Sequence, residues 1–212
     1  MTRLISEHMK RIEENRNNKL VEILEILKQN DPKKIKEEAI KLAVVSTNFL
    51  LSAFELEYRQ VTREGPSQLL VCIGTEMLLN AIIASEAPIE FVKLYEQRNK
   101  IPSYEVIKTQ SQRIINVGFS QTQKRRMTDV LSLIQSKRNL FSHFSLGFHA
   151  MYYQHFEMLN VICYLLEKYF PNLPEPIQHL KTIKERFRFK DDKDYDYVVF
   201  EIVEPEVRAL QE

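Results

Sequence analysis

The sequence has little glycine and almost no net charge, and each of these features excludes some kinds of fold or binding partner. Only 4 of the 212 residues are glycine, which argues against a fold with many tight turns. The 30 basic and 29 acidic residues leave a formal net charge of +1. No global basic field therefore attracts nucleic acid, and any RNA contact must come from a local patch. Apolar residues make up 44 %, enough for the core of one domain.

Cysteines, signal segments and several catalytic motifs are also scarce or missing. Cys72 and Cys163 lie far apart in apolar stretches, without another Cys or a His at ligand spacing, which predicts two buried thiols rather than a disulfide or a metal pair. Residues 1–7 contain no apolar signal core, and no uncharged run reaches membrane-spanning length. The chain has no phosphate-cradling glycine loop, paired-cysteine motif or serine nucleophile elbow. We therefore expect a cytoplasmic protein that uses no membrane, metal or cofactor.

What the sequence does contain is helical periodicity along most of its length. Apolar residues three and four apart predict helices over about 2–29, 32–61, 67–85, 88–100, 102–117, 121–144 and 149–169. The 67–85 segment is apolar around most of its girth, which is typical of a central core helix. We expect an N-terminal helix over 1–30 that packs on or extends the bundle, a helical domain over 31–170, and a linker and tail over 171–212. In the tail, a short amphipathic segment precedes alternating residues at 186–189 and 195–203, which predict one β-hairpin.

An arginine occupies a position where the pattern of the 121–144 helix predicts an apolar residue. The apolar stripe Met127, Val130, Leu131 and Ile134 continues to positions 138 and 141, and position 138 is Arg. Because an unpaired buried charge is costly, Arg138 must either be paired, for instance with Glu76, or face a cleft. Both alternatives remain open at this point.

Asn139 and His143 follow Arg138 at spacings that suit a catalytic pair. They are four residues apart and share a helix face, so the amide can hydrogen-bond the imidazole and select its tautomer. Arg138 and His143 are five apart, roughly 140° around an ideal helix. Two copies of the helix facing each other across a two-fold axis could bring both residues into one composite pocket.

Such a pocket suits the cleavage of RNA. The 2′-hydroxyl of RNA is an internal nucleophile that DNA lacks. A histidine can remove its proton or protonate the leaving oxygen, and an arginine fork can stabilise charge that develops on the phosphate. The expected products are a 2′,3′-cyclic phosphate and a 5′-hydroxyl fragment, and no metal is required.

The pattern Arg138-Asn139-x3-His143 resembles the Arg-polar-x3-His signature of the HEPN superfamily, and the helical context is similar over about residues 31–170. The resemblance implies an all-α bundle of about four to seven helices, with long N-terminal helices, that dimerises through the motif helices. Many members are metal-independent endoribonucleases in toxin–antitoxin, abortive-infection and CRISPR-linked antiviral defence. Carried over, Arg138 would bind or polarise the phosphate, His143 would be the acid/base, and Asn139 would orient it.

Two further residues are candidates for supporting roles, Ser142 within the motif and Glu76. Glu76 resembles a helix-borne Glu that some members follow with Lys four positions later, but this chain has Asn80 there. Some toxins of the superfamily carry a modified Tyr two residues after the His. That position is Ser145 here, so regulation by that modification is not expected.

Basic residues before the motif are candidate RNA contacts, and the alternative is a solvated helix face. They are Lys124, Arg125, Arg126 and Lys137. His149 and His155, six residues apart, do not share a helix face and are interpreted as core or interface residues rather than metal ligands. Tyr152 and Tyr153 are interpreted as packing residues.

Three hypotheses follow for the function. The first is a homodimeric endoribonuclease that acts on RNA, for which an antitoxin is a possible partner protein. The second is a non-catalytic module of the same fold that binds nucleotide, RNA or protein. The third is a structural or interaction protein whose long N-terminal helices mediate assembly, which requires Arg138 in an internal salt bridge and His143 buried.

Overall fold

The computed structural model describes residues 25, 32–58, 66–96, 102–144 and 152–187, and every element in the last four ranges is an α-helix. The helices are α2 (Pro32–Tyr58), α3 (Pro66–Glu86), α4 (Pro88–Glu96), α5 (Tyr104–Ile115), α6 (Gln121–Phe144), α7 (Tyr152–Tyr169) and α8 (Pro174–Arg186). The prediction of an all-α bundle of about four to seven helices is confirmed. The helix expected over 2–29 falls outside the described residues except for position 25.

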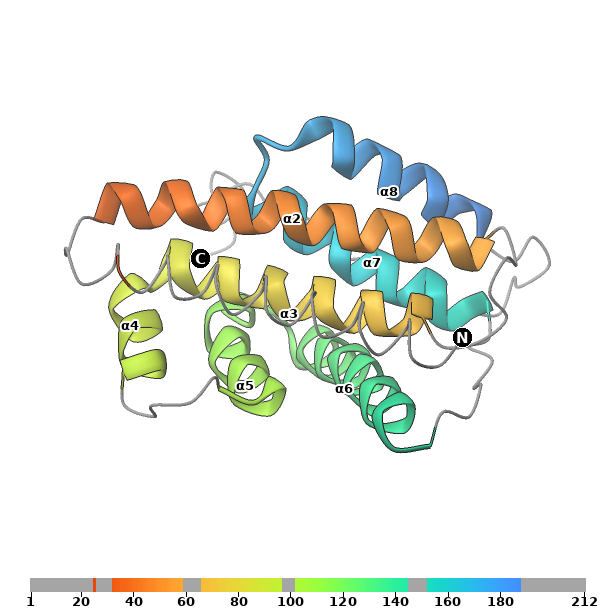
Figure 1. The fold of residues 1–212 in the computed structure, drawn as a ribbon, viewed down its shortest axis with the longest axis horizontal. Helices are drawn as coiled ribbons and strands as arrows, with labels where there is room; N and C mark the ends of the chain where they lie inside the picture. Colours follow the sequence, from red (N-terminus) through yellow and green to blue (C-terminus); the bar gives the residue numbers. More distant parts are fainter. Residues whose placement is uncertain (1–24, 26–31, 59–65, 97–101, 145–151, 188–212) are drawn as a thin grey trace.

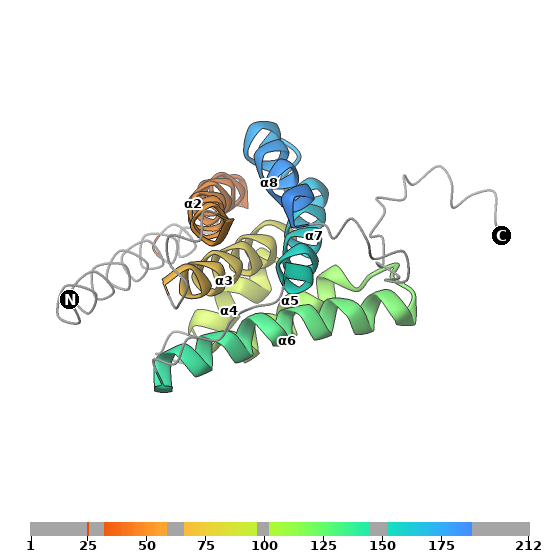
Figure 2. The same cartoon turned by 90° about the vertical axis from the view of Figure 1, so that its right-hand side faces the viewer.

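Helix α3 lies at the centre of the bundle, between two groups of helices. Helices α2 and α8 lie on one side, whereas α4, α5 and α6 lie on the other (Figure 1). The view turned by 90° shows α7 beside α3 in the middle layer (Figure 2). Helix α3 contacts α2, α4, α5, α6 and α7. Neighbours on so many sides explain why its sequence is apolar around its girth, and the prediction of a core helix over 67–85 is confirmed.

A glycine allows α2 and α3 to approach closely. A Cβ atom at Gly74 would lie 2.8 Å from Cγ of Leu50 and 3.2 Å from the carbonyl oxygen of Ser46. In addition, the Ser46 hydroxyl donates to the Gly74 carbonyl at 2.7 Å. This contact links the middles of the two longest apolar helices.

The apolar stripes predicted from periodicity are buried. On α6 the four residues Met127, Val130, Leu131 and Ile134 all belong to the core. The stripe on α2 consists of Ile35, Ala39, Leu42, Ser46 and Ala53, all buried, together with the half-buried Phe49. Both cysteine thiols are buried, as predicted, and the Cys72 thiol donates to the Ile134 carbonyl at 3.1 Å.

The amphipathic segment expected in the tail is helix α8, which packs on α2 and α7 through Ile177, Leu180 and Ile183. Arg186 is the last residue of this helix, so the prediction of a strand beginning at 186 is wrong at that end. The helical spacing of the buried residues continues to Phe187, whose ring stacks on His155 at 5.1 Å between centroids. The rest of the predicted hairpin lies outside the described residues.

Two stretches, Lys33–Leu56 and Ser67–Glu86, are long and apolar enough to cross a membrane by length and composition. Both stretches contain charged residues, so neither is an uncharged run of the kind that the sequence was found to lack. A core helix has the same length and composition, and 94 % of the apolar window in Ser67–Glu86 is buried inside the bundle.

Candidate functional site

The motif residues Arg138, Asn139, Ser142 and His143 all belong to the last two turns of α6, which is continuous from Gln121 to Phe144. The expectation that nothing breaks this helix before Ser145 is confirmed. The side chains of residues 137–144 lie outside the described part of the structure. What the structure establishes for the motif is therefore its helical backbone and its register.

The start of α6 is set by a capping box. The Gln123 backbone N–H donates to the Ser120 hydroxyl at 3.3 Å, and the Ser120 N–H donates to the Gln123 side-chain oxygen at 3.0 Å. These bonds satisfy two groups that would otherwise lack partners at a helix start. The preceding Gly118 has φ of 80°, a left-handed conformation that glycine adopts readily. The turn thus sets where α6 begins and, through the helix, the register of the motif.

Helix register places the motif positions on different faces of α6. At 100° per residue, position 138 lies roughly 40° from Ile134, on the face that carries the buried stripe. Position 143 lies roughly 180° from Ile134, on the opposite face. The stripe faces α3 and α5, because Ile134 accepts from Cys72 and the Leu131 carbonyl accepts from the Tyr104 hydroxyl at 3.2 Å. Position 138 is thus one turn beyond an internal contact.

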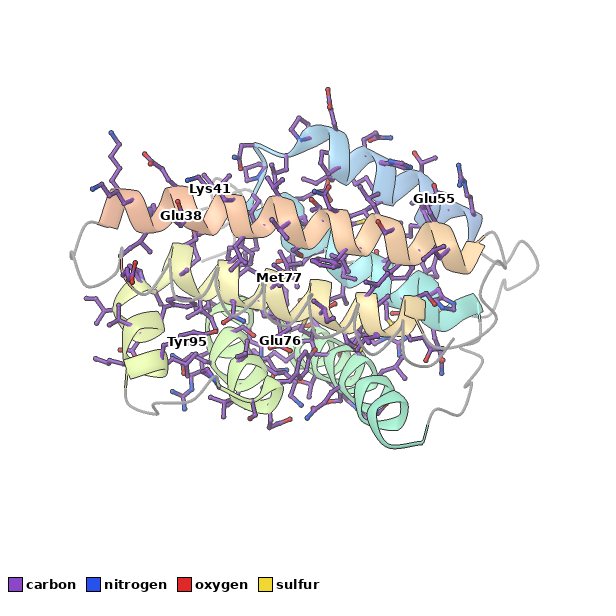
Figure 3. The ribbon with its side chains drawn as sticks, viewed as in Figure 1. Glu38, Lys41, Glu55, Glu76, Met77 and Tyr95 are labelled. Atoms are coloured by element: carbon purple, nitrogen blue, oxygen red, sulfur yellow. The ribbon has the colours of Figure 1, made fainter. Side chains whose placement is uncertain are left out.

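Glu76 is buried on the face of α3 directed toward α4 and α6, with 4 % of its surface exposed. One turn before it, Cys72 contacts α6. One turn after it, the Asn80 side-chain oxygen accepts from the Tyr95 hydroxyl of α4 at 2.6 Å. Figure 3 shows Glu76 on the side of α3 that faces α5 and α6, and Met77 on the side that faces α2. Burial of a carboxylate is costly unless it is paired or hydrogen-bonded, and Arg138 remains a predicted partner.

Three of the four basic candidates, Lys124, Arg125 and Arg126, have different environments, and the side chain of the fourth, Lys137, lies outside the described residues. Arg126 is engaged by Glu157 of α7: its Nε donates to Oε2 at 3.1 Å, and its Nη2 lies 2.7 Å from Oε1. Arg125 has a side chain that is 87 % exposed and lies 4.0 Å from Asp129, as expected of a solvated face. Lys124 is half-buried. Of these three candidate RNA contacts, Arg126 is thus already held in an interhelical ion pair.

A buried lysine that the sequence reasoning missed joins α5 to α6. The Lys108 ammonium donates to the Ser132 hydroxyl at 3.3 Å and to the Gln135 side-chain oxygen at 3.0 Å. It also pairs with Glu105 at 2.8 Å, and this hydrogen bond lowers the pKa of the Glu105 carboxyl. Lys108 follows Tyr104 by four residues on the buried stripe of α5. A lysine on a buried stripe predicts internal hydrogen-bond or ion-pair partners, so this residue could have been identified from the sequence.

The histidines after the motif do not form a metal site in the described part. His155 is buried, with the Phe54 ring edge-on at 6.2 Å and the Phe187 ring stacked on it. Its interpretation as a core residue is confirmed. His149 and the side chains of Tyr152 and Tyr153 are outside the described residues. Within those residues, no group of three or more His, Cys, Asp or Glu side chains is arranged to hold a metal ion.

Comparison with known proteins adds no relative, because no family model, no curated protein and no solved structure matches this chain.

Proposed function

We propose that this chain is a metal-independent endoribonuclease that acts as a homodimer. The observation that carries the proposal is the placement of Arg138, Asn139 and His143 on one unbroken helix of an all-α bundle. This is the context in which the HEPN-like motif is expected to work. A setting in a toxin–antitoxin or defence system, with an antitoxin protein as partner, is part of the same proposal.

The helix register favours a site that two chains build together. Positions 138 and 143 diverge by roughly 140° on α6, so one straight helix does not aim both at one phosphate. In a two-fold dimer the same patch occurs twice. The Arg138 of one copy and the His143 of the other then face the same cleft.

The chemistry follows from the residue types. His143 removes the proton of the ribose 2′-hydroxyl, and the 2′-oxygen forms a bond to phosphorus. The bond from phosphorus to the 5′-oxygen breaks, that oxygen takes up a proton from solvent and leaves as a 5′-hydroxyl, and His143 returns its proton to solvent. Arg138 neutralises the charge on the phosphate oxygens, and the Asn139 amide keeps the imidazole in the required tautomer. The other product is a 2′,3′-cyclic phosphate.

The test is RNA cleavage in excess EDTA by wild type, Arg138→Ala and His143→Ala. We expect cleavage by the wild type with cyclic-phosphate ends, and its loss in both variants. His179→Ala and Arg186→Ala are matched controls, because both residues pair with Glu55 at the α2–α8 contact, across α3 from α6 (Figure 1). They should cleave RNA like the wild type.

A mixing experiment tests the composite site. Equal amounts of Arg138→Ala and His143→Ala protein, unfolded and refolded together, give mixed dimers as half of the population. Each mixed dimer has one intact pocket, so about a quarter of the wild-type rate should return. No recovery, with mixed dimers demonstrated, would exclude a pocket shared in this way. A folded dimer that binds RNA without cleaving it would favour the non-catalytic binding module instead.

A further inference from the structure

A pocket of about 470 Å³ opens where the end of α5 meets the start of α6. It lies around the turn that contains Gly118, far along α6 from the motif. The described residues that line it are Thr109, Gln112, Arg113, Asn116, Val117, Gly118 and Lys124. The pocket is thus formed by two helices and the turn that connects them.

The charges in this pocket have one sign. Arg113 and Lys124 are both cationic, and no described residue that lines the pocket carries a carboxylate. The Arg113 guanidinium is exposed and donates to a neutral group, the Gln110 side-chain oxygen, at 3.3 Å. Within the described part of the chain, neither cation has a carboxylate within ion-pairing distance. This differs from Arg126, two residues after Lys124, which is paired with Glu157.

Neutral polar groups complete the lining. The Gln112 amide donates to the Thr128 hydroxyl at 2.9 Å and so holds the α5 wall against α6. The side-chain oxygen of Asn116 is buried and has no hydrogen-bond partner among the described residues. A buried amide oxygen requires a donor, and because this one is closed to solvent, a ribose hydroxyl would reach it only after the Asn116 side chain turns toward the pocket. Two cations beside an unsatisfied acceptor suit a sugar–phosphate unit.

We propose that this pocket binds the phosphodiester backbone of RNA. The choice of RNA as the ligand rests on the proposed ribonuclease function, whereas the preference for a phosphate rests on the pocket itself. Arginine forks onto phosphate oxygens and lysine supplies a point charge. None of the described lining residues is aromatic, so the contact positions the strand and does not read its bases.

The distance along α6 makes the pocket an anchor rather than part of the reacting centre. Lys124 precedes Arg138 by 14 residues on the same helix, which corresponds to roughly 21 Å at the rise of an α-helix. RNA held in the pocket would therefore contact the protein several nucleotides from the phosphate that is cleaved.

The experiment measures binding of a fluorescent single-stranded RNA to His143→Ala protein, in which the proposed acid/base is absent, over a range of salt concentrations. In this background, Arg113→Ala or Lys124→Ala should each weaken binding. Each should also reduce the magnitude of the negative slope of log K against log salt by about 0.7. Lys36→Ala is the matched control, because Lys36 is exposed on α2, across α3 from α6 (Figure 2). It should leave the slope unchanged, and circular dichroism should show all variants folded.

The outcomes separate this proposal from the catalytic one. Pocket-dependent RNA binding without any cleavage by the wild type would support the anchor and refute the ribonuclease. Cleavage by the wild type, with the same salt slope in the pocket variants as in Lys36→Ala, would refute only the anchor. Inorganic phosphate is the second probe, and its binding is measured by calorimetry. The assignment to RNA would be overturned if Lys124→Ala weakened phosphate binding while neither substitution changed RNA binding. It would also be overturned if the protein bound no RNA.

Discussion

The ion pair between Arg126 and Glu157 joins α6 to α7, and breaking it from either side should have unequal effects. The Glu157 side chain is only 4 % exposed, whereas that of Arg126 is 27 % exposed. Removing the arginine leaves a carboxylate that water can scarcely reach. Removing the negative charge leaves a guanidinium that can turn toward solvent.

The expected magnitudes follow from this difference. Loss of one partner from a buried ion pair costs about 3–5 kcal/mol. The partial exposure of Arg126 weakens the pair, so we expect about 3 kcal/mol for Arg126→Met, which keeps an apolar stem in place. Glu157→Gln preserves the shape and removes the charge, and should cost about 1 kcal/mol. Whole domains are stable by only about 5–15 kcal/mol, so the first change is a large fraction of the total.

The assay is urea-induced unfolding followed by far-ultraviolet circular dichroism, with free energies of unfolding extrapolated to water. Arg125→Met is the control, since this neighbouring side chain is 87 % exposed, and it should stay within about 0.5 kcal/mol of the wild type. The double variant Arg126→Met/Glu157→Gln should be more stable than Arg126→Met alone, because it removes the stranded charge. The reasoning is refuted if Glu157→Gln costs as much as Arg126→Met, or if Arg126→Met behaves like the control.

Two other positions give predictions in the core. Gly74→Ala should lower the free energy of unfolding by about 1–2 kcal/mol, because overpacking against Leu50 outweighs the gain in helix propensity; in a Leu50→Ala background, urea unfolding should reveal no such loss. Burial raises the pKa of the Cys163 thiol to about 12 from its ordinary value of 9.0, so a thiol reagent at pH 8 should modify it far more slowly in folded than in urea-unfolded protein. Because the unfolded thiol ionises first, stability should fall as pH rises above 9, and Cys163→Ala should reduce that fall; equal alkaline loss in both proteins would contradict the assignment.

The helices that depend on local apolar spacing and on residues that start or break a helix can be predicted from the sequence. Helix α6 was predicted from Met127 to Ile134 by apolar spacing and continued through His143, because no residue before Ser145 breaks a helix. Helix α3 was predicted as the core helix because its own sequence is apolar around most of the helix circumference. Periodicity also predicted the core placement of both cysteines. The motif itself is a local pattern, and its helical backbone follows from the same rules.

The pairing of charged residues depends on how the helices pack. Arg125 and Arg126 are adjacent in a basic run, yet one is solvated and the other is held by Glu157, which lies 31 residues further along the chain. Arg113 and Lys124 belong to different helices, and the turn at Gly118 brings them to one pocket. The β-hairpin prediction was wrong at Arg186 because packing of Phe187 against α2 and α7 extends the helical pattern there. Sequence periodicity reports which side of a helix is buried, but the identity of the neighbour depends on how distant helices pack.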